Sequence, residues 1–399
     1  MKRIAFVVQR YGTEVNGGAE LHCRQFAERM AKYYEVEAIT TKAVDYVTWA
    51  DAYEADTETL NGVLVRRFSV DEPRDIEAFN RLSQTVMQFH ASKEEEEEWM
   101  RKQGPYSTSL LRYLAEHKDE YDVFIFFTYL YATTYFGLPI VKEKAMIIPT
   151  AHDELPIYLG IFKDLFLMPR AYFYNTAIEQ AFVEKKFGCS HILNNGGAGG
   201  VGVDVPAAIS AERFREKYGL DDFILYIGRI DEHKGCKELF QYFMQYKKRN
   251  PGSLKLVLAG KEVIPIPESE DIVSLGFVTD RDKFDVLAAC KLLVLPSQFE
   301  SLSMVVLEAM AVKRPVVIHG NCEVVRQHCV KSNGGLYYRN YFEFEGCLNY
   351  LLEREELCQK MGENGKQYVD ENYCWDAIEN RLKNMIEEVG DLHEHEENN

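Results

Sequence analysis

The sequence lacks the positive charge by which nucleic-acid-binding proteins are usually recognised. It has 46 Lys and Arg against 63 Asp and Glu, which gives a net charge of −17. A chain of this charge without a long basic run repels polyanions, and it is not drawn to anionic membrane surfaces. We therefore expect no nucleic-acid partner, and any membrane association to be at most peripheral.

Long hydrophobic runs and paired cysteine motifs are also missing. No apolar run approaches the roughly 18 residues that a membrane span needs, and the N-terminus has the pattern of a first β-strand, unlike a signal peptide. The nine cysteines are scattered and form no CxxC motif, so neither a zinc site nor a disulfide framework is predicted. These absences favour a reducing, cytoplasmic location.

Two common cofactor signatures are not matched. The glycine pair after the first predicted strand, Gly17-Gly18, does not belong to a GxGxxG motif, so a nicotinamide-binding fingerprint is not found there. No DxD pair of carboxylates stands at the end of a predicted strand, so a divalent metal is not required. We expect neither a cofactor nor a metal.

The chain does have enough length and apolar content for two domains. Its 399 residues, 46% of them hydrophobic, exceed the roughly 250–300 at which a single core stops growing. Short buried strands alternate with helices, which is typical of parallel sheets covered on both faces. We predict an α/β protein with two doubly wound, Rossmann-like domains facing across a cleft, at residues 1–205 and 206–374. A C-terminal helix with an acidic tail, 375–399, is expected to pack back on the first domain.

The elements of each half follow from hydrophobic periodicity. In the first half, strands are predicted at 4–9, 36–40, 63–68, 123–127 and 145–150, and helices over 75–102 and 172–186. In the second half, strands are predicted at 223–227, 254–259, 272–275, 292–295 and 315–318, and helices at 237–247, 282–289, 304–311 and 375–389, the last ending in a frayed tail. A glycine-rich segment, 194–203, predicts a linker or tight loop, and the five glutamates of 94–98 are interpreted as a solvated face.

Gly17 and Gly18 are the first feature with chemical meaning. They follow a buried strand and open a helix, where glycine lets backbone N–H groups approach an anion. Taken alone, the pair is better explained as a plain tight turn.

The second feature is the loop after the strand at 223–227. Gly228, Arg229, Lys234 and Gly235 place two cations five residues apart at the expected edge of the sheet. Arginine can engage two phosphate oxygens and lysine supplies a point charge, so the loop suits a diphosphate. A solvated loop is the alternative.

The third feature pairs Glu300 with Glu308 around a predicted helix start. Ser303 is a plausible N-cap, and the free N–H groups of a helix that starts near it would point at an anion. Glu308 lies within an apolar run, so its carboxylate needs a partner. Sugar hydroxyls would serve, and a buried arginine or backbone group is the alternative.

The order of these features resembles family 4 of the retaining glycosyltransferases, which share the GT-B fold, and the likeness runs over essentially the whole chain. The resemblance implies that Arg229 and Lys234 hold the diphosphate of a nucleotide sugar donor, with amides of Ser303, Met304 and Val305. Glu300 would contact the transferred sugar and Glu308 the ribose. Gly18 would approach the diphosphate from the other domain, and His152 matches the family's histidine near the reacting sugar.

Three further segments bear on the resemblance. The family often has glycine around 301–303, where this chain has Ser301, Leu302 and Ser303; this departure bears on which sugar is transferred. The segment 199–204 resembles the family's hinge before the second domain. Aromatic residues at 129–136 and 158–174 could line an acceptor pocket, although core packing is the favoured interpretation.

The predicted reaction moves a sugar from a nucleotide diphosphate sugar to an acceptor hydroxyl, of a glycan, glycolipid or small molecule, with retention of configuration and without metal. The cations and the helix start would stabilise the charge of the leaving diphosphate. Two alternatives stay open: a nucleotide-sugar epimerase of the same fold, and a catalytically silent subunit that binds nucleotide sugars. A polysaccharide pathway is expected from the resemblance alone.

Overall fold

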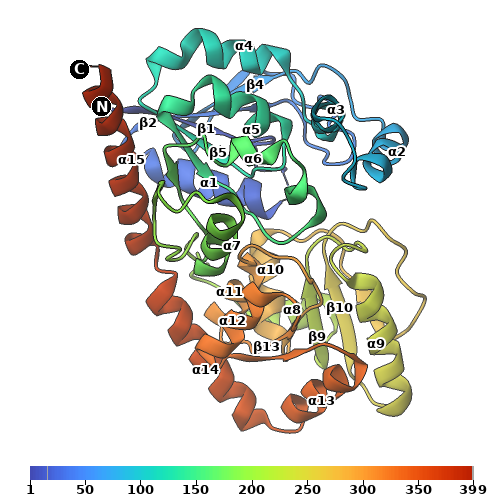
Figure 1. Cartoon of the computed structure of the whole chain (residues 1–399). Helices are drawn as coiled ribbons and strands as arrows, with labels where there is room; N and C mark the ends of the chain where they lie inside the picture. Colours follow the sequence, from blue (N-terminus) through green and yellow to red (C-terminus); the bar gives the residue numbers. More distant parts are fainter. Residues whose placement is uncertain (16, 398–399) are drawn as a thin grey trace. The chain divides into compact units, whose positions relative to one another are not determined.

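The computed structural model describes residues 1–15 and 17–397, and for 392–397 the backbone alone. The chain divides into two compact units, which are coloured along the sequence in Figure 1. Unit 1 comprises Met1–Gly200 and Asp376–Asn399, and unit 2 comprises Val201–Trp375. The boundaries that we predicted, after 205 and after 374, remain predictions.

Unit 1 is built on an eight-stranded sheet with the strand order β3-β4-β2-β1-β5-β6-β7-β8. All pairs are parallel except β3 with β4. The strands are β1 (Arg3–Val7), β2 (Glu35–Thr41), β3 (Thr57–Leu60), β4 (Val63–Phe68), β5 (Val123–Phe127), β6 (Ala145–Ile148), β7 (Ala171–Tyr172) and β8 (Leu193–Asn194). The central strand β5 is buried along its whole length, because helices cover both faces.

The helices of unit 1 form a layer on each face of this sheet. The helices α4 and α5 lie on one face, and α1 and α15 lie on the other (Figure 1). The bounds are α1 (Gly18–Met30), α2 (Ile76–Val86), α3 (Lys93–Gln103), α4 (Thr108–His117), α5 (Ala132–Gly137), α6 (Phe162–Leu165), α7 (Ala177–Phe187) and α15 (Trp375–Glu397).

Helix α15 returns to unit 1 at the end of the chain and is fixed there by ion pairs. Glu379 accepts from Arg29 of α1 at 2.7 Å, and Glu387 lies 2.8 Å from Lys2. The apolar side of the helix, which includes Ile378, Leu382 and Ile386, is fully buried. The helix extends to Glu397, beyond the end at 389 that we predicted, so the expectation of a frayed tail directly after 389 is wrong.

Unit 2 has a six-stranded parallel sheet with the order β11-β10-β9-β12-β13-β14. Its strands are β9 (Phe223–Ile227), β10 (Lys255–Ala259), β11 (Ile272–Ser274), β12 (Leu293–Leu295), β13 (Val316–His319) and β14 (Gly335–Tyr338). Its helices are α8 (Ala211–Tyr218), α9 (Cys236–Arg249), α10 (Asp280–Ala289), α11 (Met304–Ala311), α12 (Glu323–Ser332), α13 (Tyr341–Leu352) and α14 (Glu355–Asn372). The order of strands reverses between β9 and β12, which is where ligands bind in open sheets of this kind.

Two expectations about unit 1 are wrong in detail. The predicted helix at 172–186 begins only at Ala177, since Ala171–Tyr172 pairs with β6 as a strand and Thr176 caps the helix by accepting the Glu179 amide. The glutamate run in α3 is not uniformly solvated. Glu96 is buried, and its carboxylate accepts the amide of Ile161 at 2.9 Å.

All nine cysteines are free. Among the described helices, none is long and apolar enough to cross a membrane.

Candidate functional site

The predicted donor-binding residues of unit 2 gather where its strands end. The chain leaves β9 at Gly228, whose φ is +149°, and the next strand, β10, is followed by Gly260. A Cβ at Gly260 would lie 1.9 Å from the Gly228 carbonyl oxygen, so the two loops meet backbone to backbone. Only glycine permits this close approach. This contact fixes the backbone at Gly228, and therefore the position of Arg229, the next residue, at the carboxyl edge of the sheet.

The two predicted cations of this loop are each paired with a carboxylate. Arg229 Nε bonds to Asp231, and Lys234 Nζ lies 2.7 Å from Glu300 Oε1. Asp231 is buried and also accepts the Lys234 amide at 2.7 Å, so it organises the loop from within. The pKa of Lys234 is lowered by burial but raised more by the Glu300 carboxylate, and lies above its ordinary value. The structure thus brings Arg229, Lys234 and Glu300 together.

Helix α11 begins at Met304 as predicted, but Ser303 does not cap it with its side chain. Ser303 has φ 66° and ψ 80°, and its Oγ is buried without a hydrogen-bond partner among the described residues. The hydroxyl cannot reach the N2 or N3 amide from this left-handed conformation, so the expected cap is wrong. Val306 is the first residue to donate back to Ser303 O, at 3.2 Å. The amides of Met304 and Val305 are therefore left as the donors that a helix N-terminus offers to an anion.

Glu308 has a protein partner that the sequence did not reveal. Its Oε1 lies 2.7 Å from Nζ of Lys283 in α10, and both side chains are nearly buried. Burial raises the pKa of Glu308 above its ordinary value, and Lys283 offsets only part of that rise. The alternative of a buried partner for Glu308 is thus met, by a lysine in place of an arginine. The contact with ribose stays a prediction.

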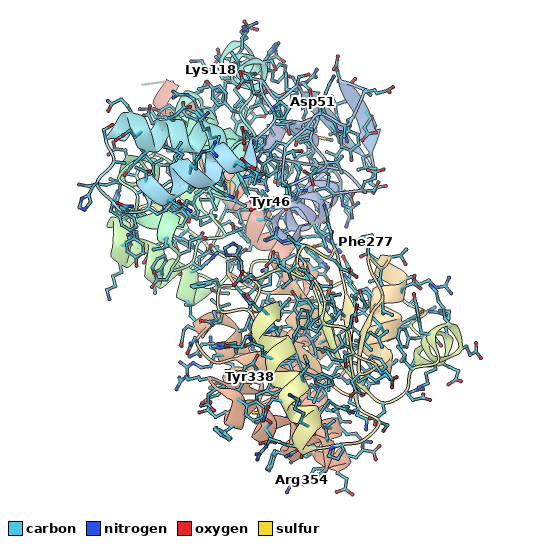
Figure 2. The ribbon with its side chains drawn as sticks, turned by 90° about the vertical axis from the view of Figure 1, so that its right-hand side faces the viewer. Tyr46, Asp51, Lys118, Phe277, Tyr338 and Arg354 are labelled. Carbon is cyan, nitrogen blue, oxygen red and sulfur yellow. The ribbon has the colours of Figure 1, made fainter. Side chains whose placement is uncertain are left out.

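Asp231 and Lys283 are the residues at this edge that sequence reasoning missed. Asp231 stands inside the loop already singled out, and its position three residues before Lys234 is typical of a side chain that accepts a nearby backbone amide. Lys283 has no comparable signal, because 25 residues separate it from Glu308. Phe277, in the loop after β11, is 66% exposed at the same edge and is labelled in Figure 2.

Gly17 and Gly18 lie in unit 1, at the N-terminus of α1. Gly17 precedes the helix, and a Cβ there would come within 2.0 Å of Glu20 Oε2. Glu20 is held by Arg10 Nη2 at 2.6 Å in a buried ion pair, which fixes the first turn of the helix. Asn16, the residue before the pair, lies outside the described residues.

His152 also lies in unit 1, in the loop that follows β6. Its Nε2 is 3.4 Å from Glu154 Oε2, and Glu154 in turn accepts from Tyr129 Oη at 2.6 Å. Beneath this loop, buried Glu179 accepts the amide of Ala151 at 2.6 Å. Burial raises the pKa of Glu179 to about 8, against the effect of its backbone donors. His152 is thus partly exposed, on a loop that hydrogen bonds to its neighbours Ala151 and Glu154 hold in place.

The aromatic segments that could have lined an acceptor pocket are mostly core. Tyr129, Phe162, Tyr172 and Tyr174 are buried within one apolar cluster of unit 1. Tyr158 is the exception, with 48% of its surface exposed. Core packing, the favoured interpretation, therefore holds for these buried rings.

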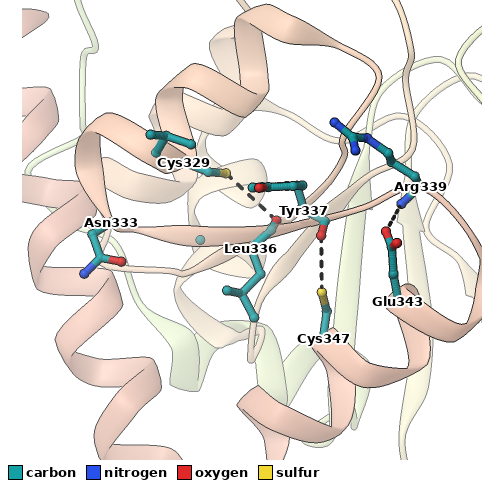
Figure 3. Close-up of a pocket in the computed structure, with 9 residues that line it drawn as sticks. Cys329, Asn333, Leu336, Tyr337, Arg339, Glu343 and Cys347 are labelled. Carbon is teal, nitrogen blue, oxygen red and sulfur yellow. Dashed lines mark hydrogen bonds between the residues drawn. The ribbon is translucent and has the colours of Figure 1, made fainter.

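A pocket of about 500 Å³ lies elsewhere in unit 2, on the edge strand β14 (Figure 3). Cys329 and Cys347 border it, and their thiols contact the carbonyl oxygens of Leu336 and Tyr337. None of the predicted site residues lines it. In the part of the chain that the structure describes, no three His, Cys, Asp or Glu side chains are grouped as metal ligands would be.

One family model matches a large part of unit 2. Residues 210–368 match the family model described as "Glycosyl transferases group 1", a span that contains Arg229, Lys234, Glu300, Ser303 and Glu308. Alpha-D-kanosaminyltransferase of Streptomyces kanamyceticus is 28% identical over 189 residues, which cover 44% of this chain and 48% of that protein. The chain spans about half the length of the curated relatives it matches.

Solved structures extend the likeness to nearly the whole chain. Sucrose-phosphate synthase from Thermosynechococcus elongatus superposes with a TM-score of 0.72 at 15% identity, covering 98% of this chain and 99% of that one. The Anabaena protein HepE, in complex with UDP and glucose, gives a TM-score of 0.71 at 15% identity and covers 97% and 100%. The fold is GT-B. The comparisons favour neither the epimerase nor the silent subunit.

Proposed function

We propose that the protein is a retaining glycosyltransferase of family 4, which transfers a sugar from a nucleoside diphosphate sugar to an acceptor hydroxyl without a metal. The observation that carries the proposal is one juxtaposition at the carboxyl edge of unit 2. Arg229 and Lys234 lie there with Glu300, which Lys234 contacts at 2.7 Å, and the same unit presents the free amides that open α11.

The chemistry of this edge suits a leaving diphosphate. As the bond between the anomeric carbon and the phosphate oxygen breaks, negative charge collects on the diphosphate, and fixed donors stabilise it without reorganising. The Lys234 ammonium pairs with the Glu300 carboxylate at 2.7 Å. When a diphosphate binds, the lysine turns to phosphate oxygens and Glu300 is released to accept from sugar hydroxyls. The acceptor oxygen then attacks from the face that the diphosphate leaves, its proton passes to a departing phosphate oxygen, and configuration is retained.

Several finer points belong to the same proposal. A similar structure binds UDP-glucose, so a uridine nucleotide is the first donor to test, and the exposed ring of Phe277 offers a surface on which a base can stack. His152 would lie near the reacting sugar, with Gly17 and Gly18 near the diphosphate. Nine free cysteines favour a reducing cytoplasm. The acceptor is a hydroxyl of a glycan, glycolipid or small molecule, as in polysaccharide biosynthesis.

Calorimetric titration with UDP, GDP and ADP, in the presence of a chelator, tests the donor site. We expect one of the three to bind wild-type protein, and Lys234→Ala to weaken that binding by tenfold or more, about 1.4 kcal/mol. Lys237→Ala is the matched control, because this neighbouring lysine is exposed and pairs only at the surface with Glu232. No binding by wild type, or equal binding by Lys234→Ala, would sink the diphosphate assignment.

Retention needs a separate readout. Once a donor and an acceptor are found, proton NMR of the first product assigns the configuration at the anomeric carbon. A product with the donor's configuration supports the same-face mechanism. An inverted product would rule it out and leave the transferase itself intact.

A further inference from the structure

The loop that enters α11 has a conformation that its own sequence does not favour. Ser303 lies in the left-handed region, φ 66°, where residues with a side chain are strained. No hydrogen bond from its hydroxyl compensates, since that oxygen is buried and without a partner in the described part of the chain. Something outside the loop must therefore hold it.

A buried histidine of α12 contacts the loop at the residue before Ser303. The ring of His328 is 2% exposed, and its Nε2 lies 2.9 Å from the carbonyl oxygen of Leu302. Since a carbonyl only accepts, Nε2 must bear the proton. The other nitrogen, Nδ1, then accepts from the hydroxyl of Tyr368 at 3.0 Å. The hydroxyl of Tyr373 is 3.4 Å from the same atom.

These contacts fix both the position and the tautomer of the ring. The hydroxyls of Tyr368, in α14, and Tyr373, directly after this helix, both face Nδ1. The single N–H of the neutral imidazole is therefore on Nε2 and is directed at the Leu302 carbonyl oxygen. Burial lowers the pKa of His328 to about 4, so the ring is neutral at pH 7. A second contact, from Cys322 Sγ to the Glu300 carbonyl oxygen, lies at the other end of the same loop.

We propose that His328 is a positioning residue of the donor site. By holding the Leu302 carbonyl it keeps Ser303 left-handed, and this backbone turn directs the amides of Met304 and Val305 outward from the start of α11. The inference rests on the proposed function, because it assigns those amides to the donor diphosphate. Glycine would adopt the left-handed conformation of position 303 without strain. Serine can occupy this position because His328, from another helix, maintains the turn.

The test compares His328→Leu with His328→Gln by calorimetry with the nucleoside diphosphate that wild type binds. Leucine fills the space and donates nothing, so we expect the Kd to rise about tenfold, the effect of 1.4 kcal/mol. Glutamine can donate to Leu302 and accept from Tyr368, so its Kd should stay within about threefold of wild type. Steady-state kinetics should show the loss in donor KM, with acceptor KM unchanged.

The outcomes separate this inference from the proposed function. Wild type that binds none of UDP, GDP and ADP overturns both. A folded His328→Leu that binds as tightly as wild type overturns the positioning role alone, and so does a His328→Gln variant that is as weak as His328→Leu. If His328→Leu does not fold, Tyr368→Phe/Tyr373→Phe removes the donors that fix the tautomer. An unchanged Kd in that folded variant would again overturn the role.

Discussion

Ser303 has a strained backbone conformation at the start of α11. Its φ of 66° costs a serine roughly 1–2 kcal/mol, whereas glycine adopts that angle freely but loses about 0.5–1 kcal/mol more entropy on folding. We expect Ser303→Gly to raise the free energy of unfolding by up to about 1 kcal/mol, measured by urea denaturation. Ser303→Ala, which keeps the strain, is the control. A glycine variant less stable than the alanine variant would contradict the strain.

Lys283 and Glu308 form a pair whose members depend on each other. With 14% and 11% of their side chains exposed, neither charge is well solvated. Removing one partner leaves the other charge buried, which costs about 3–5 kcal/mol. We therefore expect Lys283→Met to destabilise unit 2 strongly and the double variant Lys283→Met/Glu308→Gln to recover part of the loss. A double-mutant cycle in urea measures the coupling, and additive losses would mean that the two side chains are independent.

The residues of the candidate site were predictable where they stand close together in sequence. Arg229 and Lys234 share one loop, and the structure brings Glu300 to that loop at 2.7 Å from Lys234. Lys283 was not predictable, since it lies in α10, 25 residues before Glu308 of α11, and only the tertiary fold brings the two side chains together. The failed cap at Ser303 has a similar cause. Its backbone angle is set by a tertiary contact to Leu302, and residue preference alone gives no sign of it.

Helix α3 contains both a buried glutamate with a structural role and solvent-exposed glutamates. Glu96 is buried and accepts the Ile161 amide, whereas Glu98 is 47% exposed and contacts only surface cations. We expect Glu96→Ala to cost about 1–3 kcal/mol, because the amide loses its partner, and Glu98→Ala at most about 0.5 kcal/mol. Chemical denaturation of both variants checks this. Equal losses would restore the interpretation of a uniformly solvated run.

At the scale of elements, buried strands were the most predictable part of the fold. The strands at Val123–Phe127 and Phe223–Ile227 occur where apolar runs predicted them, since a strand covered on both faces is apolar throughout. The strand Val63–Phe68 also has the predicted bounds, although it contains Arg66 and Arg67 and only its alternate residues are buried. The short strand Ala171–Tyr172 was taken for the start of a helix. Two residues give no period to detect, and its pairing with β6 is visible only in the sheet.

At the scale of the molecule, the chain crosses between the units twice. It leaves unit 1 after Gly200 and re-enters it at Asp376, so α15 completes a unit whose strands all lie between Arg3 and Asn194. Arg381 of this helix also donates to the carbonyl oxygen of Ala198, within the glycine-rich segment 194–203. The part of that segment up to Gly200 therefore belongs to unit 1, whereas its glycine content alone predicted only a linker or tight loop.

The two units share a sensitivity to acid, because each contains buried histidine whose pKa is lowered by burial; unit 2 has two, His319 and His328. In unit 1, His22 lies 2.7 Å from the Gly200 carbonyl oxygen, and burial lowers the pKa of His22 to about 3. In unit 2, burial lowers the pKa of His328 to about 4. An unfolded histidine takes up a proton near pH 6.5. Below that pH the unfolded chain binds more protons than the folded chain, so stability is present above about pH 6.5 and is lost as the pH falls towards 4.

Each of these histidines contributes up to about 1.4 kcal/mol of lost stability per pH unit in that window. Glutamine cannot take up this proton in the folded or the unfolded state. We therefore expect His328→Gln to lower the slope of the unfolding free energy against pH by the contribution of one histidine, up to about 1.4 kcal/mol per pH unit. Urea denaturation of wild type and variant at several pH values between 7.5 and 4.5 measures the slope. His90→Gln, the same replacement at an exposed histidine, is the matched control for the effect of the substitution itself. Equal slopes for wild type and His328→Gln would mean that His328 is protonated in the folded protein too, and its single N–H could not then be assigned to Leu302.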